Sequence, residues 1–313
     1  MQRRLPNQEF RKLVPKLREK EFYKSQDQRK ISWPEYNLSK INELEEMLIF
    51  IRESVNKVSS IDVEGRVGKP MTNPKSLAKA VLFCEMSGLP EREAQGWLKI
   101  IGPFLGIYET LDDWVIGEAY NRFEVAFILA QIFEKTKNSD GILVGDGTGL
   151  ETSRRQNYGE NRSSTKEFIT SIVDSREIVQ AFDFSGKDEC RAMHLLIENV
   201  DGKYLCLDAG FNDRGLVQKI SEFGMQPFVF PKKNNKLNGR LAWRLMYLSL
   251  YNNIQQWLKF YHQRSHSESF HSSFKRIFGI ITKIRFSCKL TQVTARIIIH
   301  NFRKLSYYKR LKG

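Results

Sequence analysis

Hydrophobic residues recur every three or four positions through the first third of the chain, a spacing typical of amphipathic helices. Residues 38–58 predict one such helix, whose apolar positions are Leu44, Met47, Leu48, Ile51 and Val55. A loop that contains two glycines and a proline follows at residues 65–70. The first part of the chain is therefore expected to be helical.

Three helices joined by short links are predicted between residues 73 and 135. Asn73, which stands before a proline, is a typical helix start, and Gly88 predicts the end of that helix. A second helix runs over residues 91–103, and a Thr-x-x-Asp capping box that begins at Thr110 predicts one long third helix. The arrangement is compatible with a helix-turn-helix module, and equally with any small helical bundle.

The pattern changes after a polar linker at residues 137–141. Short apolar runs typical of strands follow at residues 142–144, 167–173, 177–184, 204–207 and 227–230. Helical spacing returns between them, over residues 188–200 and 216–223, and helices dominate after residue 239, with Trp243, Leu245, Leu248 and Trp257 expected in the core.

Strand, hairpin, helix, strand, helix, strand and helix is the order of a ribonuclease-H-like fold. We therefore expect an α/β domain over residues 138–313, with a mixed five-stranded sheet and flanking helices. An all-helical N-terminal domain over residues 1–137 precedes it.

Charge is spread unevenly along the 313 residues, whose formal net charge is +14. Residues 223–313 carry 18 Lys and Arg and a single acid, whereas the rest carries 32 basic and 35 acidic residues. A field of this kind suits a polyanion, most often a nucleic acid, although solubility or a membrane surface would also account for it. The basic leader, residues 1–35, is interpreted as either a flexible arm on DNA or a solvated leader.

Cysteine usage and hydropathy narrow the class of protein further. The four cysteines, Cys84, Cys190, Cys206 and Cys288, form no CxxC pair, so a zinc ribbon is not expected and each is interpreted as a small core residue. No apolar run approaches the length of a membrane span, and the first 30 residues are polar and basic. We expect a soluble, intracellular protein with no membrane partner.

Two aspartates directly follow predicted strands, Asp146 after the first and Asp208 after the fourth. If those strands are neighbours, the two side chains can converge on one cation beyond the strand ends. For either residue alone, a turn or cap role is the commoner explanation. Three further aspartates at element ends, Asp174, Asp183 and Asp188, are interpreted as turn and cap residues, with assistance to a metal site by one of them as the alternative.

The segment from residue 261 to 275 concentrates polar chemistry around Glu268, the only acid after residue 223. On a helix, Tyr261, Arg264, Glu268 and Lys275 fall within about 60° of one another. Phe270, Phe274 and Ile277 fall on the opposite side and are expected in the core. The three nearby histidines, His262, His266 and His271, are interpreted as surface residues, with DNA contact or proton transfer as the alternative.

The spacing Y-x2-R-x3-E-x6-K resembles the signature of insertion-sequence transposases that use an Asp, Asp, Glu triad (DDE transposases). Asp146 stands in D-G-T and Asp208 in D-A-G-F, contexts similar to those of the first and second acids of that family. The intervals between the three acids are 62 and 60 residues. The second interval leaves no room for a large inserted β-domain.

This resemblance, over residues 140–305, implies a DNA transposase with a ribonuclease-H-like catalytic domain. It implies that Asp146, Asp208 and Glu268 are catalytic and hold two Mg²⁺ ions, with Mn²⁺ as a substitute. The expected DNA-binding residues are Tyr261, Arg264, Lys275 and Arg276. The helix-turn-helix-like segment 73–135 then becomes the candidate for reading DNA.

The resemblance also implies partners and a location. The expected partners are double-stranded DNA, as terminal inverted repeats and as target, and a second copy of the chain on paired ends. The expected location is the cytoplasm of a prokaryote, in association with the nucleoid. No phosphate-binding glycine loop is evident, so no nucleotide cofactor is expected.

Two other interpretations stay open. One is a DNA-binding protein that descends from a transposase and no longer catalyses. The other is a ribonuclease-H-like nuclease that hydrolyses DNA without joining strands.

Overall fold

The computed structural model describes residues 7–19, 31–59, 72–155, 164–186 and 188–311, and its contacts divide the chain into two compact units. The first unit draws on the segments 1–30, 138–149 and 167–273, and the second on the segments 31–137, 150–166 and 274–313. The linker before residue 138 therefore falls at a border between the units, and the C-terminal segment shares a unit with the N-terminal helices.

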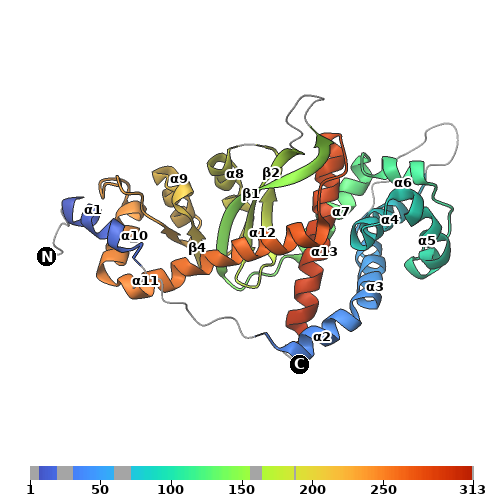
Figure 1. Cartoon of the computed structure of the whole chain (residues 1–313), viewed down its shortest axis with the longest axis horizontal. Helices are drawn as coiled ribbons and strands as arrows, with labels where there is room; N and C mark the ends of the chain where they lie inside the picture. The colour runs from blue at the N-terminus through green and yellow to red at the C-terminus, as the bar shows by residue number, and fades with distance from the viewer. Residues whose placement is uncertain (1–6, 20–30, 60–71, 156–163, 187, 312–313) are drawn as a thin grey trace. The chain divides into compact units, whose positions relative to one another are not determined.

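A five-stranded sheet forms the centre of the first unit (Figure 1). Its strands are β1 (Ile142–Arg155), β2 (Ser164–Asp174), β3 (Val179–Asp183), β4 (Tyr204–Leu207) and β5 (Gln226–Val229), and they lie in the order β3-β2-β1-β4-β5. β1 and β5 pair parallel to β4, and β2 pairs antiparallel to β3. The sheet is mixed, and the predicted ribonuclease-H-like α/β fold is confirmed.

The central strands are buried on both faces, as parallel strands covered by helices must be. Leu143 and Val144 of β1 and Leu205, Cys206 and Leu207 of β4 are fully buried. The helices of this unit are α1 (Asn7–Lys16), α8 (Glu189–Leu196), α9 (Arg214–Glu222), α10 (Leu241–Asn252), α11 (Ile254–Tyr261) and most of α12 (Ser265–Phe278). Three short 3-10 helices join them: η2 (Ile197–Asn199), η3 (Ala209–Phe211) and η4 (His262–Arg264).

Several details of the first unit differ from the sequence-based prediction. β1 does not end at Gly145 but runs on to Arg155, so Asp146 lies within the strand. Part of the basic leader forms α1, because Phe10, with its ring 4.9 Å from that of Tyr247, gives the helix an apolar side. Leu245, which was expected in the core, is 55% exposed.

The second unit is built around two buried helices, α4 (Pro74–Ser87) and α13 (Phe286–Arg310). Residues 76–85 of α4 are all buried, and α13 packs against α4 and against α7 (Phe123–Thr136). The remaining helices are α2 (Trp33–Ile41), α3 (Glu43–Asn56), α5 (Glu91–Leu105) and α6 (Asp113–Ala119). Of the described helices, none is both long and apolar enough to cross a membrane.

Helix ends in the second unit test the capping predictions. The Asn73 side chain accepts a hydrogen bond from the Lys75 amide at 2.9 Å, and α4 ends at Gly88, as predicted. The predicted long helix from Thr110 is wrong, because this segment forms two helices, α6, which ends at Ala119, and α7, which begins at Phe123. The cap of α6 is Asp112, whose side chain accepts a hydrogen bond from the Val115 amide at 2.7 Å. The predicted helix over residues 38–58 is likewise two helices, α2 and α3.

Candidate active site

Asp146, within β1, and Asp208, directly after β4, occupy matched positions on two neighbouring segments. Gly145 of β1 pairs with Leu207 of parallel β4, so each aspartate is the next residue along its strand. Asp146 Oδ1 accepts a hydrogen bond from the Gly147 amide at 2.9 Å, and Asp208 Oδ1 accepts one from the Gly210 amide at 2.6 Å. The sheet therefore brings the two carboxyl groups to the same edge.

The pKa of the Asp146 carboxyl is raised at this site. Burial raises the pKa of its carboxyl to about 6, and the negative charges of Asp208 and Glu189 add to that effect. The Gly147 hydrogen bond and the charge of Arg264 act in the opposite direction. Two acids that repel each other in a partly buried place form a site that a divalent cation would stabilise.

Glu268 approaches the same place from helix α12. Its side chain is 55% exposed, and its Oε1 accepts a hydrogen bond from Arg264 Nη2 at 2.5 Å. Burial opposes the charge of the Arg264 guanidinium, but the acidic groups around it outweigh burial and raise its pKa. Those groups are Tyr261, Glu268, Asp146 and Asp208. Arg264 thus interacts with all three predicted catalytic acids.

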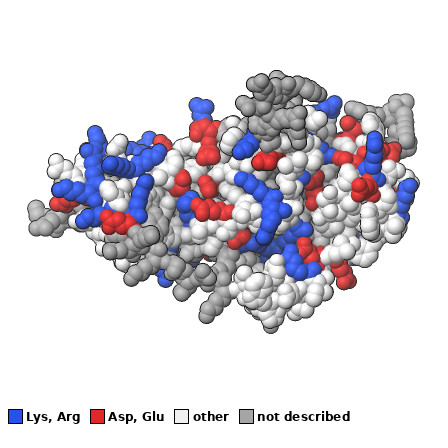
Figure 2. Space-filling view, viewed as in Figure 1, with Lys and Arg blue, Asp and Glu red and all other residues white. Residues whose placement is uncertain are grey.

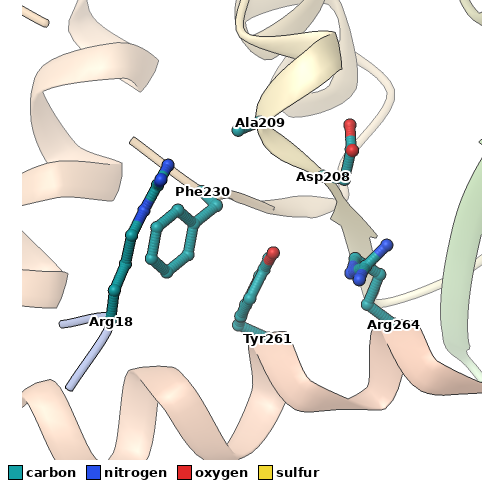
Figure 3. Close-up of a pocket in the computed structure, with 6 residues that line it drawn as sticks. All are labelled: Arg18, Asp208, Ala209, Phe230, Tyr261 and Arg264. Atoms are coloured by element: carbon teal, nitrogen blue, oxygen red, sulfur yellow. The ribbon is translucent and has the colours of Figure 1, made fainter. Parts of the chain in front are cut away.

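A pocket of about 330 Å³ opens beside Asp208. Its lining residues are Arg18, Asp208, Ala209, Phe230, Tyr261 and Arg264. Figure 3 shows Tyr261 and Arg264 pointing from the helix segments toward the side that carries Asp208, and Arg18 beside Phe230. The ring of Phe230 lies 4.9 Å from the ring of Tyr261, and the Arg18 guanidinium lies 5.6 Å from the centre of the Phe230 ring. The pocket combines two cations, a phenol and a carboxylate.

Three residues that sequence reasoning missed lie at this site. Glu189, the first residue of α8, fills the space beside Gly147, where an added Cβ would come within 2.4 Å of Glu189 Oε1. Burial, Asp208 and Asp188 raise the pKa of Glu189. Its position at the first turn of a helix gave no sign of this, because an acid there is a common helix stabiliser.

His271 and Arg18 are the other two. His271 is buried rather than on the surface, with Nδ1 4.0 Å from Asp146 Oδ2 and Nε2 3.1 Å from the Ser171 hydroxyl. Arg18 follows α1 and reaches the pocket because that helix packs on the first unit. Both contacts join segments far apart in sequence, and no local pattern predicts them.

The other predicted site residues lie at the two ends of the segment 261–276. Tyr261 is buried at the end of α11, and Lys275 and Arg276 are exposed in the last turns of α12. Phe270 and Phe274 are buried as expected, whereas Ile277 is 42% exposed, which corrects the prediction for that side of the helix.

Exposed Lys and Arg residues gather at the end of the first unit that carries α1 and α10 (Figure 2). We call this set the basic surface; its members are Arg11, Lys12, Lys16, Lys232, Lys233, Lys236, Arg240 and Arg244. A surface of this composition suits a phosphate backbone.

The competing aspartates have structural partners. Asp174 forms an ion pair with Arg176 at 2.7 Å, Asp183 accepts a hydrogen bond from the Ser185 amide, and Asp188 caps α8. Among the described residues, the one group whose ligand atoms already lie within 4.8 Å of one another is Cys190, His194 and Asp213. The three predicted catalytic acids are not gathered so closely, in keeping with the pairing of Glu268 and Arg264.

The fold and the acidic edge of the sheet define a ribonuclease-H-like protein. A family model described as Transposase DDE domain matches residues 137–302, more than half of the chain, and the chain belongs to that family. Membership implies a nuclease or transferase type of enzyme that acts on DNA and uses a divalent metal ion. No curated protein matches the sequence.

Proposed function

We propose that the protein is a transposase that binds the ends of its own insertion sequence, cleaves the DNA strands there and joins the 3′-hydroxyl ends to target DNA. The observation that carries the proposal is the matched position of Asp146 and Asp208 on β1 and β4, with Arg264 linking both to Glu268. Membership of a transposase family supports a role for these acids in chemistry on DNA phosphodiesters.

We propose that Asp146, Asp208 and Glu268 hold Mg²⁺, with Mn²⁺ as a substitute. Carboxylate oxygens are the donors that hard divalent cations prefer, and burial, with a smaller contribution from the charges of Asp208 and Glu189, raises the pKa of Asp146, which a bound cation would lower. When bound in a two-metal site, these ions activate the attacking oxygen and stabilise the leaving one.

Arg264 has two tasks in this proposal. It holds the Glu268 carboxylate before DNA arrives, and it then binds a DNA phosphate, for which the planar guanidinium fork is well suited. Exchange of one anion for the other frees Glu268 to join Asp146 and Asp208. Arg18 and the Tyr261 hydroxyl contribute further donors to the same phosphate pocket.

Lys275, Arg276 and the basic surface would bind DNA backbone without reading its sequence. Sequence would be read by the helical N-terminal domain over residues 1–137. Because α4 is buried along its length, that role falls on other helices of the segment 73–135. Assembly as a homodimer on paired ends, in the prokaryotic cytoplasm at the nucleoid, completes the proposal.

The test is a cleavage and joining assay with Mg²⁺ on DNA that carries the element's ends. Asp146→Asn, Asp208→Asn and Glu268→Gln should each lower both rates by about a thousandfold or more, since removal of one member disables a catalytic unit. DNA binding should survive. Asp201→Asn, an exposed acid before β4, is the matched control and should keep full activity.

The outcomes separate the proposal from its alternatives. Mg²⁺-dependent cutting that persists in one variant would refute the role of that residue. Cleavage without joined product would identify a nuclease, and binding without cleavage in either Mg²⁺ or Mn²⁺ would identify a DNA-binding descendant.

The phosphate contacts have a test of their own. Lys275→Ala should weaken binding of end DNA and reduce the slope of log affinity against log salt by about one, as expected for the loss of one phosphate contact. Unchanged binding across salt concentrations would remove Lys275 from the DNA interface.

A further inference from the structure

A second group of metal-ligating side chains lies at the junction of α8 and α9. Cys190 and His194 stand one helical turn apart on α8, so their side chains share one side of the helix. Asp213, the N-cap of α9, lies opposite them. The sulfur, a ring nitrogen and a carboxylate oxygen all lie within 4.8 Å of one another, and His194 Nε2 is 3.3 Å from Asp213 Oδ1.

We propose that Cys190, His194 and Asp213 bind one zinc-class transition-metal ion. Thiolate, imidazole and carboxylate are the three protein donors that Zn²⁺ takes, and three of them leave a fourth tetrahedral position for water or another small ligand. A thiolate suits a borderline ion and not Mg²⁺, so the site selects against the ion expected at the acidic edge.

The surroundings favour a cation. All three ligands are half-buried, which allows an ion to enter and yet limits its hydration. Burial raises the pKa of the Cys190 thiol, the nearby carboxylates of Asp213 and Asp188 add to that effect, and Lys232 opposes it. An incoming dication would be attracted by this excess of negative charge.

A hydrogen-bonded helix cap is the plainer explanation, and it accounts for part of the group. Asp213 Oδ1 accepts the Leu216 amide at 2.6 Å, which is an ordinary N-cap, and His194 can add to it. That arrangement gives no role to Cys190, which faces the same point from the first turn of α8. Metal binding accounts for all three side chains together.

The position of the group gives the ion a structural effect. Asp213 lies five residues after Asp208, and α8 begins with Glu189, which lies against Gly147. An ion shared by the two helices would tie the segment that follows Asp208 to the helix that carries Glu189. The inference does not depend on the proposed transposase reaction, because its test is metal binding.

The experiment is a titration of the full chain, freed of metal by a chelator, with Co²⁺ as a spectroscopic substitute for Zn²⁺. We expect a thiolate-to-cobalt charge-transfer band that saturates at one ion per chain, is displaced by Zn²⁺, and persists in excess Mg²⁺. Cys190→Ser should abolish the band. Asp213→Asn, which preserves the N-cap, should weaken Co²⁺ binding by about tenfold or more.

Cys288→Ser is the matched control, since this buried thiol of α13 belongs to no ligand group among the described residues and its loss should leave the band intact. Zn²⁺ should also raise the melting temperature of the wild-type chain more than that of Asp213→Asn, which keeps the test valid if Cys190→Ser folds poorly. No charge-transfer band in the wild type, or one that persists in Cys190→Ser, would overturn the proposal. Equal Zn²⁺ stabilisation of wild type and Asp213→Asn would overturn it as well.

Discussion

Two carboxylates, the buried Glu85 of the second unit and the half-buried Asp146 of the first, have different surroundings. In the second unit, Glu85 accepts hydrogen bonds from Arg296 Nε at 2.6 Å, the Tyr120 hydroxyl at 2.8 Å and Gln292 Nε2 at 2.9 Å. In the first unit, Asp146 accepts a hydrogen bond from the Gly147 amide at 2.9 Å, and the acids Asp208 and Glu189 act against the charge of Arg264 there. The charge of Glu85 is balanced by Arg296, whereas burial and nearby acids disfavour the ionised form of Asp146.

The difference separates an acid that the fold uses for stability from one that it holds for chemistry. A buried charge is tolerated when a cation and hydrogen-bond donors surround it, as they surround Glu85. At Asp146 the Gly147 amide and the charge of Arg264 compensate burial only in part, so its ionised form costs stability until a metal ion adds positive charge. The raised pKa of Asp146 and the closely paired Glu85 are therefore two solutions to the same electrostatic problem.

The largest expected effect is on the neutralised side of the comparison. Glu85→Gln removes the charge that balances Arg296, whose side chain is only 7% exposed, and leaves that cation buried without compensation. We expect a loss of about 3–5 kcal/mol in the free energy of unfolding of the second unit. Urea denaturation at neutral pH measures it.

Glu53→Gln, which breaks an exposed ion pair with Lys57 on α3, is the control and should leave the denaturation midpoint almost unchanged. A Glu85→Gln protein as stable as the wild type would contradict the structural role of Glu85.

On the other side of the comparison, Asp146→Asn should stabilise the metal-free protein. The folded-state pKa of Asp146, about 6, lies above its ordinary value of 3.8. Below pH 3.8 the carboxyl is protonated in both states and costs nothing. As pH rises from 3.8 to 6, the unfolded state ionises before the folded state, so the folded state loses stability, and above pH 6 the loss is complete at up to roughly 3 kcal/mol for a shift of this size. The variant should therefore gain up to that amount at pH 7 and nothing near pH 3.8.

Thermal unfolding of both proteins in a chelator, across this pH range, measures the difference. A gain that did not depend on pH would contradict the electrostatic explanation, because an asparagine with better packing would stabilise equally at every pH.

Addition of Mg²⁺ should also change the free energy of unfolding of the wild type and of Asp146→Asn to different extents, and by a somewhat smaller amount. Mg²⁺ at one hundred times its dissociation constant should stabilise the wild type by about 2.7 kcal/mol. It should stabilise Asp146→Asn much less, because one of the proposed ligands has gone. Equal stabilisation of the two proteins by Mg²⁺ would place the ion elsewhere. Melting temperatures with and without Mg²⁺ at pH 7 give the result.

The sequence could predict those features of the site that depend on residues close together in the chain. The positions of Asp146 and Asp208 beside short apolar runs sufficed to expect them near each other if the two strands were neighbours, and the parallel pairing of Gly145 with Leu207 places them at matched positions although β1 continues beyond Asp146. The succession of strands and helices along the chain and the Asn73 cap were predictable because short stretches of sequence encode them. Thr110 shows the limit, because a capping box was predicted there and the structure instead caps α6 with Asp112.

The remaining site residues depend on contacts between segments far apart in the chain. Glu189 meets Gly147 across 42 positions, and His271 reaches Ser171 across 100. Arg18 reaches the pocket only because α1 packs where the leader was expected to be extended or solvated. Such pairs have no fixed spacing, so periodicity and capping rules carry no information about them.

The smallest effect on stability is expected at Glu268, and it decides to which side of the comparison this acid belongs. The Glu268 side chain is 55% exposed, and exposed ion pairs such as its pair with Arg264 contribute little. Glu268→Gln should change the free energy of unfolding by less than about 1 kcal/mol while it abolishes DNA cleavage. Denaturation and cleavage measured on one preparation test both parts. A loss as large as that of Glu85→Gln would make Glu268 a structural partner of Arg264, and the acidic edge would then lose its proposed third member.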